Sequence, residues 1–318
     1  MQAPVTLEQV VVVPRNGLGN RLQAWASAAI LAAEWDVPLK IMWEPEAPAP
    51  ATAQELFTPE AINRTFVDRA WLDEHLGQRH ENLPRYLTVD HGSRSVILAG
   101  HDRGEQVFMP DLGAAFTHRS QPRSLIIIAG GLFHLPAASD FLRQRSIFYG
   151  RLPWASHLTH IADRQAEPHR PYCALHIRQT DRSIQAPTAS TIRASLAELA
   201  DTVPERSLFI AADTLTGRES WASQARGSGF DVWTAEGTDF DRTATPGALS
   251  AAVDWMLLSR ATALAYPAAS TFSAEAAVAA GRTDVSIPMQ ASQRQQRLRV
   301  WRMHGRNALT YPIRHWRH

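Results

Sequence analysis

Short runs of consecutive apolar residues alternate along the chain with longer segments in which apolar residues recur every three or four positions. The run at 10–13 contains no polar residue, which is typical of a strand buried on both faces of a parallel sheet. From 21 to 35 the apolar residues follow helical spacing, and 39–43 forms a second strand-like run. A strand, a glycine-containing turn, a helix and another strand predict the opening of a doubly wound α/β domain.

A second series of buried strands and helices begins near residue 170, after an irregular stretch at 44–119 and a polar linker at 167–171. Strands are predicted at 125–128, 172–177, 207–211, 231–233 and 263–266, and helices at 139–149, 153–165, 189–199, 218–228, 249–259 and 273–280. Two such series predict an α/β protein whose two Rossmann-like halves face each other across a cleft, the usual location of a ligand site. We place the halves at 1–168 and 169–290, followed by a C-terminal segment at 291–318.

Length and composition fit this organisation. The chain has 318 residues, more than one hydrophobic core usually serves, and its 45% apolar and 20% charged residues are ordinary for a folded protein. A net charge of +1 argues against a general nucleic-acid-binding protein, which needs a broad positive field. The single cysteine, Cys173, excludes a disulfide framework and a thiolate metal site. The N-terminus lacks the pattern of a signal peptide and no apolar run spans a bilayer, so we expect a cytoplasmic protein.

The C-terminal segment is basic, with seven arginines between residues 294 and 318 that lie among Trp301, Tyr311 and Trp316. This composition favours a helix that packs across the two halves with a solvated arginine face. It also fits contact with an anionic membrane surface, which is the alternative interpretation.

The turn after the first strand contains Gly17 and Gly19. Glycines let the backbone approach a ligand closely, and the helix that follows offers free N–H groups. Asn20 stands at the mouth of this turn, where its amide can hydrogen-bond a sugar or acceptor hydroxyl or simply cap the helix. The turn partly matches a dinucleotide-binding fingerprint with Glu44 as the ribose-binding acid, but Leu22 occupies the third glycine position. A nicotinamide-dependent oxidoreductase is therefore an alternative.

A polar segment at 176–181 ends the first strand of the second half. Strand alternation directs His176 and Arg178 to one face and Ile177 to the other. At the end of a strand in an open α/β sheet, the first face borders the crevice. A guanidinium binds two phosphate oxygens and keeps its charge at any relevant pH, so Arg178 can hold a diphosphate. Asp181 can orient either side chain, or pair with Arg178 in a purely structural ion pair.

Carboxylates and hydroxyls accompany the later elements of the second half. Asp213 follows an apolar strand, and Asp254 lies on a helix, where it can accept a hydrogen bond from a base amino group or face solvent. A hydroxyl-rich turn precedes the last helix and consists of Ser270, Thr271, Phe272 and Ser273. Such a turn can cradle a phosphate, and its hydroxyls can also cap the helix.

In this order the segments resemble those of the GT-B fucosyltransferase superfamily, which includes nodulation-factor and core α1,6-, α1,2- and protein O-fucosyltransferases. The matching segments are 17–21, Pro38 with Trp43, 152–153, 176–181, 212–213, 254–259 and 270–273. Each segment is short, and their common order carries the resemblance. The resemblance implies a GT-B fold with an acceptor-binding N-terminal domain and a GDP-sugar-binding C-terminal domain.

The resemblance also implies a role for each matching residue. Arg178 would bind the β-phosphate of the donor with His176 beside it, and Asn20 would lie near the transferred sugar and the acceptor. Asp213 and Asp254 would lie near the nucleoside. The GDP phosphates would contact Ser270, Thr271, Phe272 and Ser273. Members of the superfamily invert the anomeric centre and need no metal, so we expect no metal and no cofactor besides the GDP-sugar donor and a glycan acceptor.

The chain departs from the superfamily at several positions. Gln179 and Arg182 stand where the core α1,6 enzymes have a second arginine and a lysine, and 184–190 contains no carboxylate to act as a general base, which leaves the base unassigned. We expect a bacterial-type, inverting, metal-independent glycosyltransferase that moves a sugar, with L-fucose favoured, from a GDP-sugar to a glycan or other hydroxyl acceptor. The alternatives are another nucleotide-sugar donor, an NAD(P)-dependent oxidoreductase, and a non-catalytic nucleotide-binding protein.

Overall fold

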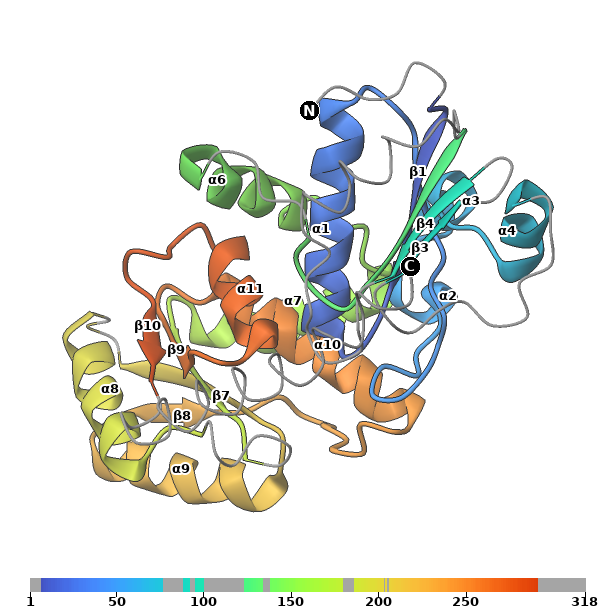
Figure 1. The fold of residues 1–318 in the computed structure, drawn as a ribbon. Coiled ribbons are helices and arrows are strands. Elements are labelled where there is room, and N and C mark those ends of the chain that lie inside the picture. Colours follow the sequence, from blue (N-terminus) through green and yellow to red (C-terminus); the bar gives the residue numbers. More distant parts are fainter. Residues whose placement is uncertain are drawn as a thin grey trace, which may run out of the picture.

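The computed structural model describes residues 7–76, 88–91, 95–99, 123–133, 138–179, 186–202, 204 and 206–290. These residues form two lobes, each built on one five-stranded sheet, with helices around and between the sheets (Figure 1). Asp181 and the basic segment 291–318 lie outside the described residues, so the expectations placed on them stay predictions.

The first sheet belongs to the N-terminal half and has the strand order β2-β1-β5-β4-β3. Its strands are β1 (Gln9–Pro14), β2 (Leu39–Ile41), β3 (Thr88–His91), β4 (Ser95–Ala99) and β5 (Ser124–Ala129). All neighbours pair in parallel except β3, which runs antiparallel to β4 at the edge. The consecutive valines of β1 are fully buried, because the sheet is covered on both faces at this strand.

Helix α1 (Leu18–Glu34) follows β1 and begins three residues earlier than the apolar spacing predicted. The stretch that we expected to be irregular contains further helices in addition to β3 and β4. They are α2 (Ala53–Leu56), α3 (Pro59–Thr65) and α4 (Arg69–Leu76). Helices of four to eight residues span too few turns to display a helical period, so the sequence pattern does not reveal them.

The second sheet is entirely parallel and has the order β10-β9-β6-β7-β8. Its strands are β6 (Cys173–Ile177), β7 (Ser207–Ala212), β8 (Asp231–Trp233), β9 (Leu264–Pro267) and β10 (Ile287–Met289). The helices of this half are α8 (Ala189–Thr202), α9 (Leu215–Gly227), α10 (Thr245–Arg260) and α11 (Thr271–Ala279). Apolar residues of α8 and α9 cover one face, and those of α10 cover the other. Strand β10 was not predicted. The other strands lie within one residue of their predicted bounds, and α9 and α10 begin three and four residues earlier than predicted.

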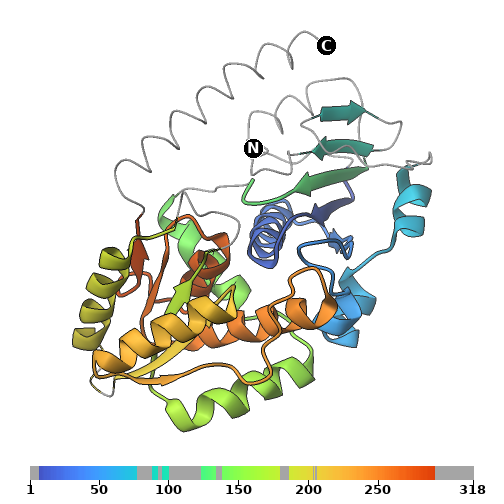
Figure 2. The same cartoon turned by 90° about the horizontal axis from the view of Figure 1, so that it is seen from below.

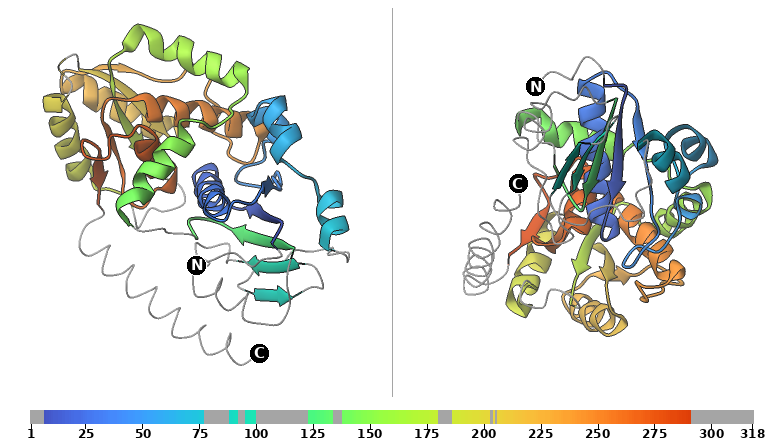
Figure 3. Two further views of the ribbon diagram at one scale, coloured as in Figure 1. Left: turned by 90° about the horizontal axis from the view of Figure 1, so that it is seen from above. Right: turned by 45° about the vertical axis from the view of Figure 1, so that its right-hand side comes forward.

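The two halves meet along a layer of helices. Helix α6 (Ala138–Tyr149), α7 (Ser156–Ala166) and the 3₁₀ helix η1 (Glu167–His169) connect the sheets. Helices α10 and α11 of the second half pack against α1, α6 and α7 of the first (Figure 2, Figure 3). Buried apolar residues from both halves form one continuous cluster, so the junction is part of the hydrophobic core. Among the described helices, none is both long and apolar enough to cross a membrane.

Candidate functional site

The order of the second sheet creates a crevice between β6 and β9. The chain proceeds from β6 to β7 and β8 on one side, and then to β9 and β10 on the other. The loops that leave β6 and β9 therefore diverge, and such a switch point is where open α/β sheets bind ligands. Arg178 directly follows β6, and Ser270 follows β9 by three residues.

His176 is buried at this switch point and holds the two loops together. Its Nδ1 lies 2.8 Å from the Oγ of Ser273 in the first turn of α11, and its ring lies 5.4 Å from that of Phe272. Burial, followed by the charge of Arg178, lowers the pKa of His176 to about 3. The imidazole is therefore neutral at physiological pH, and it positions its neighbours without contributing charge.

The main chain after Arg178 is held by Asp213, which follows β7. The backbone N–H of Gln179 donates to both carboxylate oxygens of Asp213, at 2.9 and 3.0 Å. Thr214 donates from its hydroxyl to the amide oxygen of Gln179 at 3.3 Å. Asp213 thus fixes the turn that carries Arg178, a role that the sequence did not reveal. Its predicted contact with a nucleoside stays a prediction.

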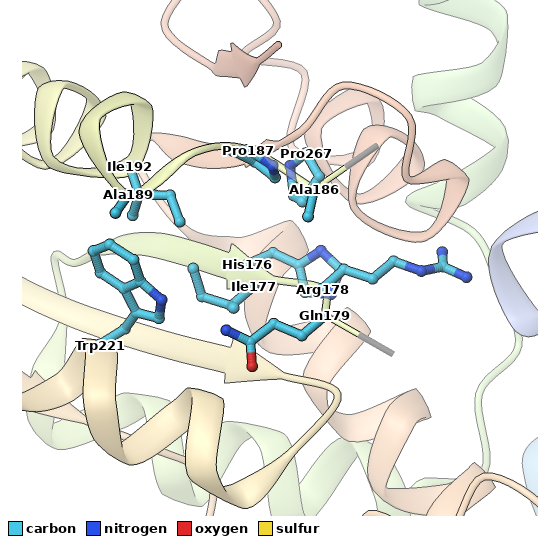
Figure 4. A pocket seen from close by; sticks show the side chains of 10 residues that line it. All are labelled: His176, Ile177, Arg178, Gln179, Ala186, Pro187, Ala189, Ile192, Trp221 and Pro267. Carbon is cyan, nitrogen blue, oxygen red and sulfur yellow. The ribbon is translucent and has the colours of Figure 1, made fainter. Parts of the chain in front are cut away.

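Arg178 is half-buried. Arg178, His176 and Gln179 line one part of a cavity of about 200 Å³ beside β6, and the side chain of Arg178 points away from the apolar residues on the other side (Figure 4). The apolar wall of this cavity includes Ile177, Pro187, Ala189, Ile192, Trp221 and Pro267. Because Ile177 packs on this side while Arg178 extends away from it, the predicted alternation of side chains along the strand is confirmed.

The N-terminus of α11 has the properties of an anion site. Ser270 is the residue preceding the helix, and its side chain makes no capping hydrogen bond, so the alternative that this hydroxyl caps the helix is wrong. Its Oγ is buried and, within the described part of the chain, has no hydrogen-bond partner. The first N–H groups of a helix also lack intrahelical acceptors and carry the positive end of the helix dipole. The turn therefore combines a buried hydroxyl with a helix N-terminus, beside the His176 that Ser273 contacts.

The glycine turn of the first half reaches this same helix. A Cβ built on Gly19 would lie 2.4 Å from the Cα of Phe272, so only glycine permits the two helix N-termini to touch. Gly17 occupies the N-cap position of α1, and Asn20 lies within its first turn, half-buried. The alternative that Asn20 caps the helix is therefore wrong. Asn20 directly follows Gly19, which contacts α11, so Asn20 lies where the two halves meet.

A buried carboxylate, which sequence analysis missed, fastens α11 to the first half. Glu275 accepts hydrogen bonds from the Nε2 of Gln23 in α1 and the hydroxyl of Tyr149 in α6, both at 2.6 Å. Arg145 adds an ion pair at 3.5 Å. Its only signal in the sequence is a lone carboxylate within an alanine-rich helix. This cluster sets the position of the α11 N-terminus relative to α1.

Asp254 lies on the buried side of α10, so its expected alternative as a plain surface carboxylate is wrong. Burial raises the pKa of Asp254 to about 7, and the charge of Arg218 opposes this rise. The guanidinium of Arg218 lies over the Phe240 ring at 4.8 Å and donates to the carbonyl of Ala235 at 3.4 Å. A desolvated carboxylate of this kind favours a ligand that supplies N–H donors.

Glu44, the candidate ribose-binding acid, lies among arginine side chains. Its carboxylate forms ion pairs with Arg15 and Arg69, and its carbonyl accepts from the Nη1 of Arg21 at 2.7 Å. Arg21 is completely buried and also donates to the carbonyl of Asn16 at 2.7 Å. These contacts give Glu44 a structural role in bracing the glycine turn, which weakens its interpretation as a ribose-binding acid.

The structure is thus of the class in which two α/β units meet, with the glycine turn before α1 of the first unit facing the turn before α11 of the second. The chain matches no protein-family model and no curated protein sequence. Its structure is similar to that of POFUT1 in complex with GDP, with a TM-score of 0.55 and 14% identity over 91% of this chain and 99% of that chain.

Two further solved structures are similar. A variant of Arabidopsis thaliana FUT1 in complex with GDP has a TM-score of 0.56 and 15% identity, over 86% of this chain and 69% of that chain. The fucosyltransferase NodZ from Bradyrhizobium has a TM-score of 0.52 and 18% identity, over 85% of this chain and 92% of that chain. At these identities the likeness establishes the fold. The chain has the GT-B fold of these fucosyltransferases, which confirms the expected fold class.

Proposed function

We propose that this protein is an inverting glycosyltransferase that moves a sugar from a GDP-sugar to a glycan or another hydroxyl acceptor. One observation carries the proposal: the contact between His176 and Ser273 brings the end of β6, which Arg178 follows, to the N-terminus of α11, where the Oγ of Ser270 is buried without a partner among the described residues. A cation and a helix N-terminus suit a diphosphate, and a buried carboxylate suits a base that donates hydrogen bonds. These features together fit a nucleoside diphosphate.

The chemistry of Asp254 favours guanine among the common bases. Guanine presents an N1–H and a 2-amino group side by side, and one carboxylate can accept from both. Uracil offers a single N–H, and adenine offers an amino group next to an acceptor nitrogen. Because burial raises the pKa of Asp254 to about 7, paired donors would stabilise its charged form when the nucleotide binds.

In the proposed reaction, an acceptor hydroxyl attacks the anomeric carbon as the bond to the β-phosphate oxygen breaks, GDP leaves, and the hydroxyl proton passes to solvent water because no side chain is assigned as the base. Arg178 and the first N–H groups of α11 stabilise the negative charge that accumulates on the leaving diphosphate, and we propose that this suffices without a metal. Asn20 orients the sugar or the acceptor from the first half. L-Fucose is the favoured sugar because POFUT1 has been crystallised with GDP-fucose and NodZ is an α1,6-fucosyltransferase.

Nucleotide binding tests this proposal. Thermal shift and calorimetry with GDP, UDP, NAD and NADP should show binding of GDP, because a ligand of the folded state raises its stability. The Arg178→Ala variant should bind GDP about 10- to 100-fold more weakly, since it loses charge-assisted hydrogen bonds. Arg193→Ala is the control, because Arg193 is exposed on α8 and donates to the amide oxygen of Gln224 at 3.2 and 3.3 Å.

Two results would contradict the proposal. Stabilisation by NAD without stabilisation by GDP would favour the oxidoreductase, and GDP binding that is equal in Arg178→Ala and wild type would refute the role of Arg178. Mass spectrometry of GDP-fucose incubated with glycan acceptors then tests transfer. Tight GDP binding with no turnover of any GDP-sugar would favour a non-catalytic nucleotide-binding protein.

A further inference from the structure

The loop between β8 and α10, at 234–244, carries an arginine that sequence analysis did not consider. Its backbone is held on both sides of Arg242. The N–H of Asp241 donates to Asp239 at 2.8 Å, and Asp241 in turn accepts from the N–H and the hydroxyl of Thr243 at 2.9 and 2.6 Å. The N–H of Asp239 donates to the hydroxyl of Ser250 on α10 at 3.0 Å. Arg242 is therefore presented from a preorganised turn.

Close packing against α10 further restricts this loop. A Cβ built on Gly247 would lie 2.0 Å from the carbonyl oxygen of Asp241, so the loop rests directly on the first turn of the helix. Such contact leaves the residue beside Asp241 little freedom to move away. The position of Arg242 is thus a property of the fold of the second half.

The side chain of Arg242 reaches the first half. Its Nη2 lies 3.8 Å from the position that a Cβ on Gly17 would occupy, which is ordinary van der Waals contact. Gly17 is the N-cap residue of α1, in the turn that also contains Gly19 and leads to Asn20. Arg242 therefore extends across the junction between the halves, to the turn that faces the N-terminus of α11.

Arg242 and Arg178 also act on the same buried group. The positive charges of both arginines contribute to the lowered pKa of His176, after the larger effect of burial. Both guanidinium groups therefore lie near the imidazole that joins the β6 and β9 loops. Arg218, by contrast, is directed to Phe240 and Ala235 and affects the pKa of Asp254.

We propose that Arg242 is a second diphosphate-binding residue, which holds the nucleotide phosphates together with Arg178 from the opposite side of the switch point. This inference rests on the proposed function. A nucleoside diphosphate carries more negative charge than one guanidinium neutralises, and that charge increases as the bond to the sugar breaks. Two converging guanidinium groups match it with fixed, planar donors. Because Arg242 also touches the glycine turn, it couples diphosphate binding to the half that holds the acceptor.

Calorimetry with GDP and with guanosine tests this assignment. Arg242→Ala should weaken GDP binding about 10- to 100-fold and leave guanosine affinity unchanged, because only GDP carries the diphosphate. Arg242→Lys should restore part of the loss, since it keeps the charge without the planar fork. Arg226→Ala is the matched control: Arg226 is exposed at the end of α9 and contacts the Val232 carbonyl at 3.5 Å. Melting temperatures establish that each variant is folded.

The outcomes separate this inference from the proposed function. Wild-type protein that fails to bind GDP refutes both. Wild-type protein that binds GDP, together with an Arg242→Ala variant that binds it equally well, refutes the assignment of Arg242 alone. Equal losses for GDP and guanosine would place Arg242 at the nucleoside and would also overturn the assignment. A selective loss for GDP, absent in Arg226→Ala, supports it.

Discussion

The contact between α1 and α11 makes the substitution Gly19→Ala a sensitive test of how the two halves meet. The added Cβ would lie 2.4 and 2.5 Å from the Cα and N of Phe272, and 2.8 Å from the carbonyl carbon of Thr271. All three are backbone atoms, so no rotation of a side chain can relieve the overlap. The helices would have to separate.

The size of the effect follows from these distances. Ordinary contact begins at 3.4 Å, so the closest atom must retreat by 3.4 − 2.4 = 1.0 Å. Overpacking of a core typically costs about 1–3 kcal/mol, and a backbone clash belongs at the upper end of that range. The higher helix propensity of alanine relative to glycine stabilises the variant by at most about 1 kcal/mol. The clash outweighs this gain, so we expect Gly19→Ala to lower the free energy of unfolding by about 2 kcal/mol.

Urea denaturation and thermal melting measure this loss, which corresponds to a decrease in melting temperature of about 3 °C for a chain of this length. Gly227→Ala is the matched control. Gly227 also lies in a helix, at the end of α9, and a Cβ there would meet no atom within 4 Å. This variant should be as stable as wild type or more stable by up to about 1 kcal/mol. If Gly19→Ala proves as stable as Gly227→Ala, the two helices do not touch as described.

Two further substitutions test the buried carboxylates. Asp254 has its pKa raised from 3.8 to about 7, so the folded protein retains a proton that the unfolded chain releases, and stability falls as the pH rises between these values. Asp254→Asn should remove this pH dependence and be more stable than wild type by about 1–3 kcal/mol at pH 8. Urea denaturation at pH 5 and pH 8 measures the difference. An unchanged pH dependence would contradict the assignment. Glu275→Gln should lose about 3 kcal/mol of stability because it leaves the buried Arg145 without its counter-charge, whereas Glu219→Gln on the exposed side of α9 should lose almost none. A Glu275→Gln variant with wild-type stability would show that the cluster does not fasten the halves.

The proposed site is assembled at the junction between the two halves. The turn at 270–273, the glycine turn and the loop of Arg242 each belong to a different stretch of the chain. The Gly19 contact and the Glu275 cluster hold the first two turns together, and α10 holds the loop of Arg242. We infer that substitutions in this helical layer affect nucleotide binding even where they touch no ligand, because they move the α11 N-terminus.

The sequence by itself determined the α/β class, most strands and helices of the second half, and the position of Arg178 at a strand end. These features depend on a few neighbouring residues: an unbroken apolar run encodes a buried strand, and helical spacing encodes a helix. The bounds of β8, for example, agree with the predicted 231–233. The alternation along β6 follows from the backbone geometry of any strand.

Only the tertiary structure decided which side chains meet. His176 and Ser273 are separated by 97 residues, and Gln23 and Glu275 by 252, so no local pattern relates them. Asn20, for which capping was the alternative interpretation, lies inside the helix because Gly17 takes the cap position. Arg242 was overlooked because it stands in an irregular loop, where neither periodicity nor strand ends mark a residue. Its importance arises from the packing of two sheets against a common helical layer, which brings one loop of the second half to the glycine turn of the first.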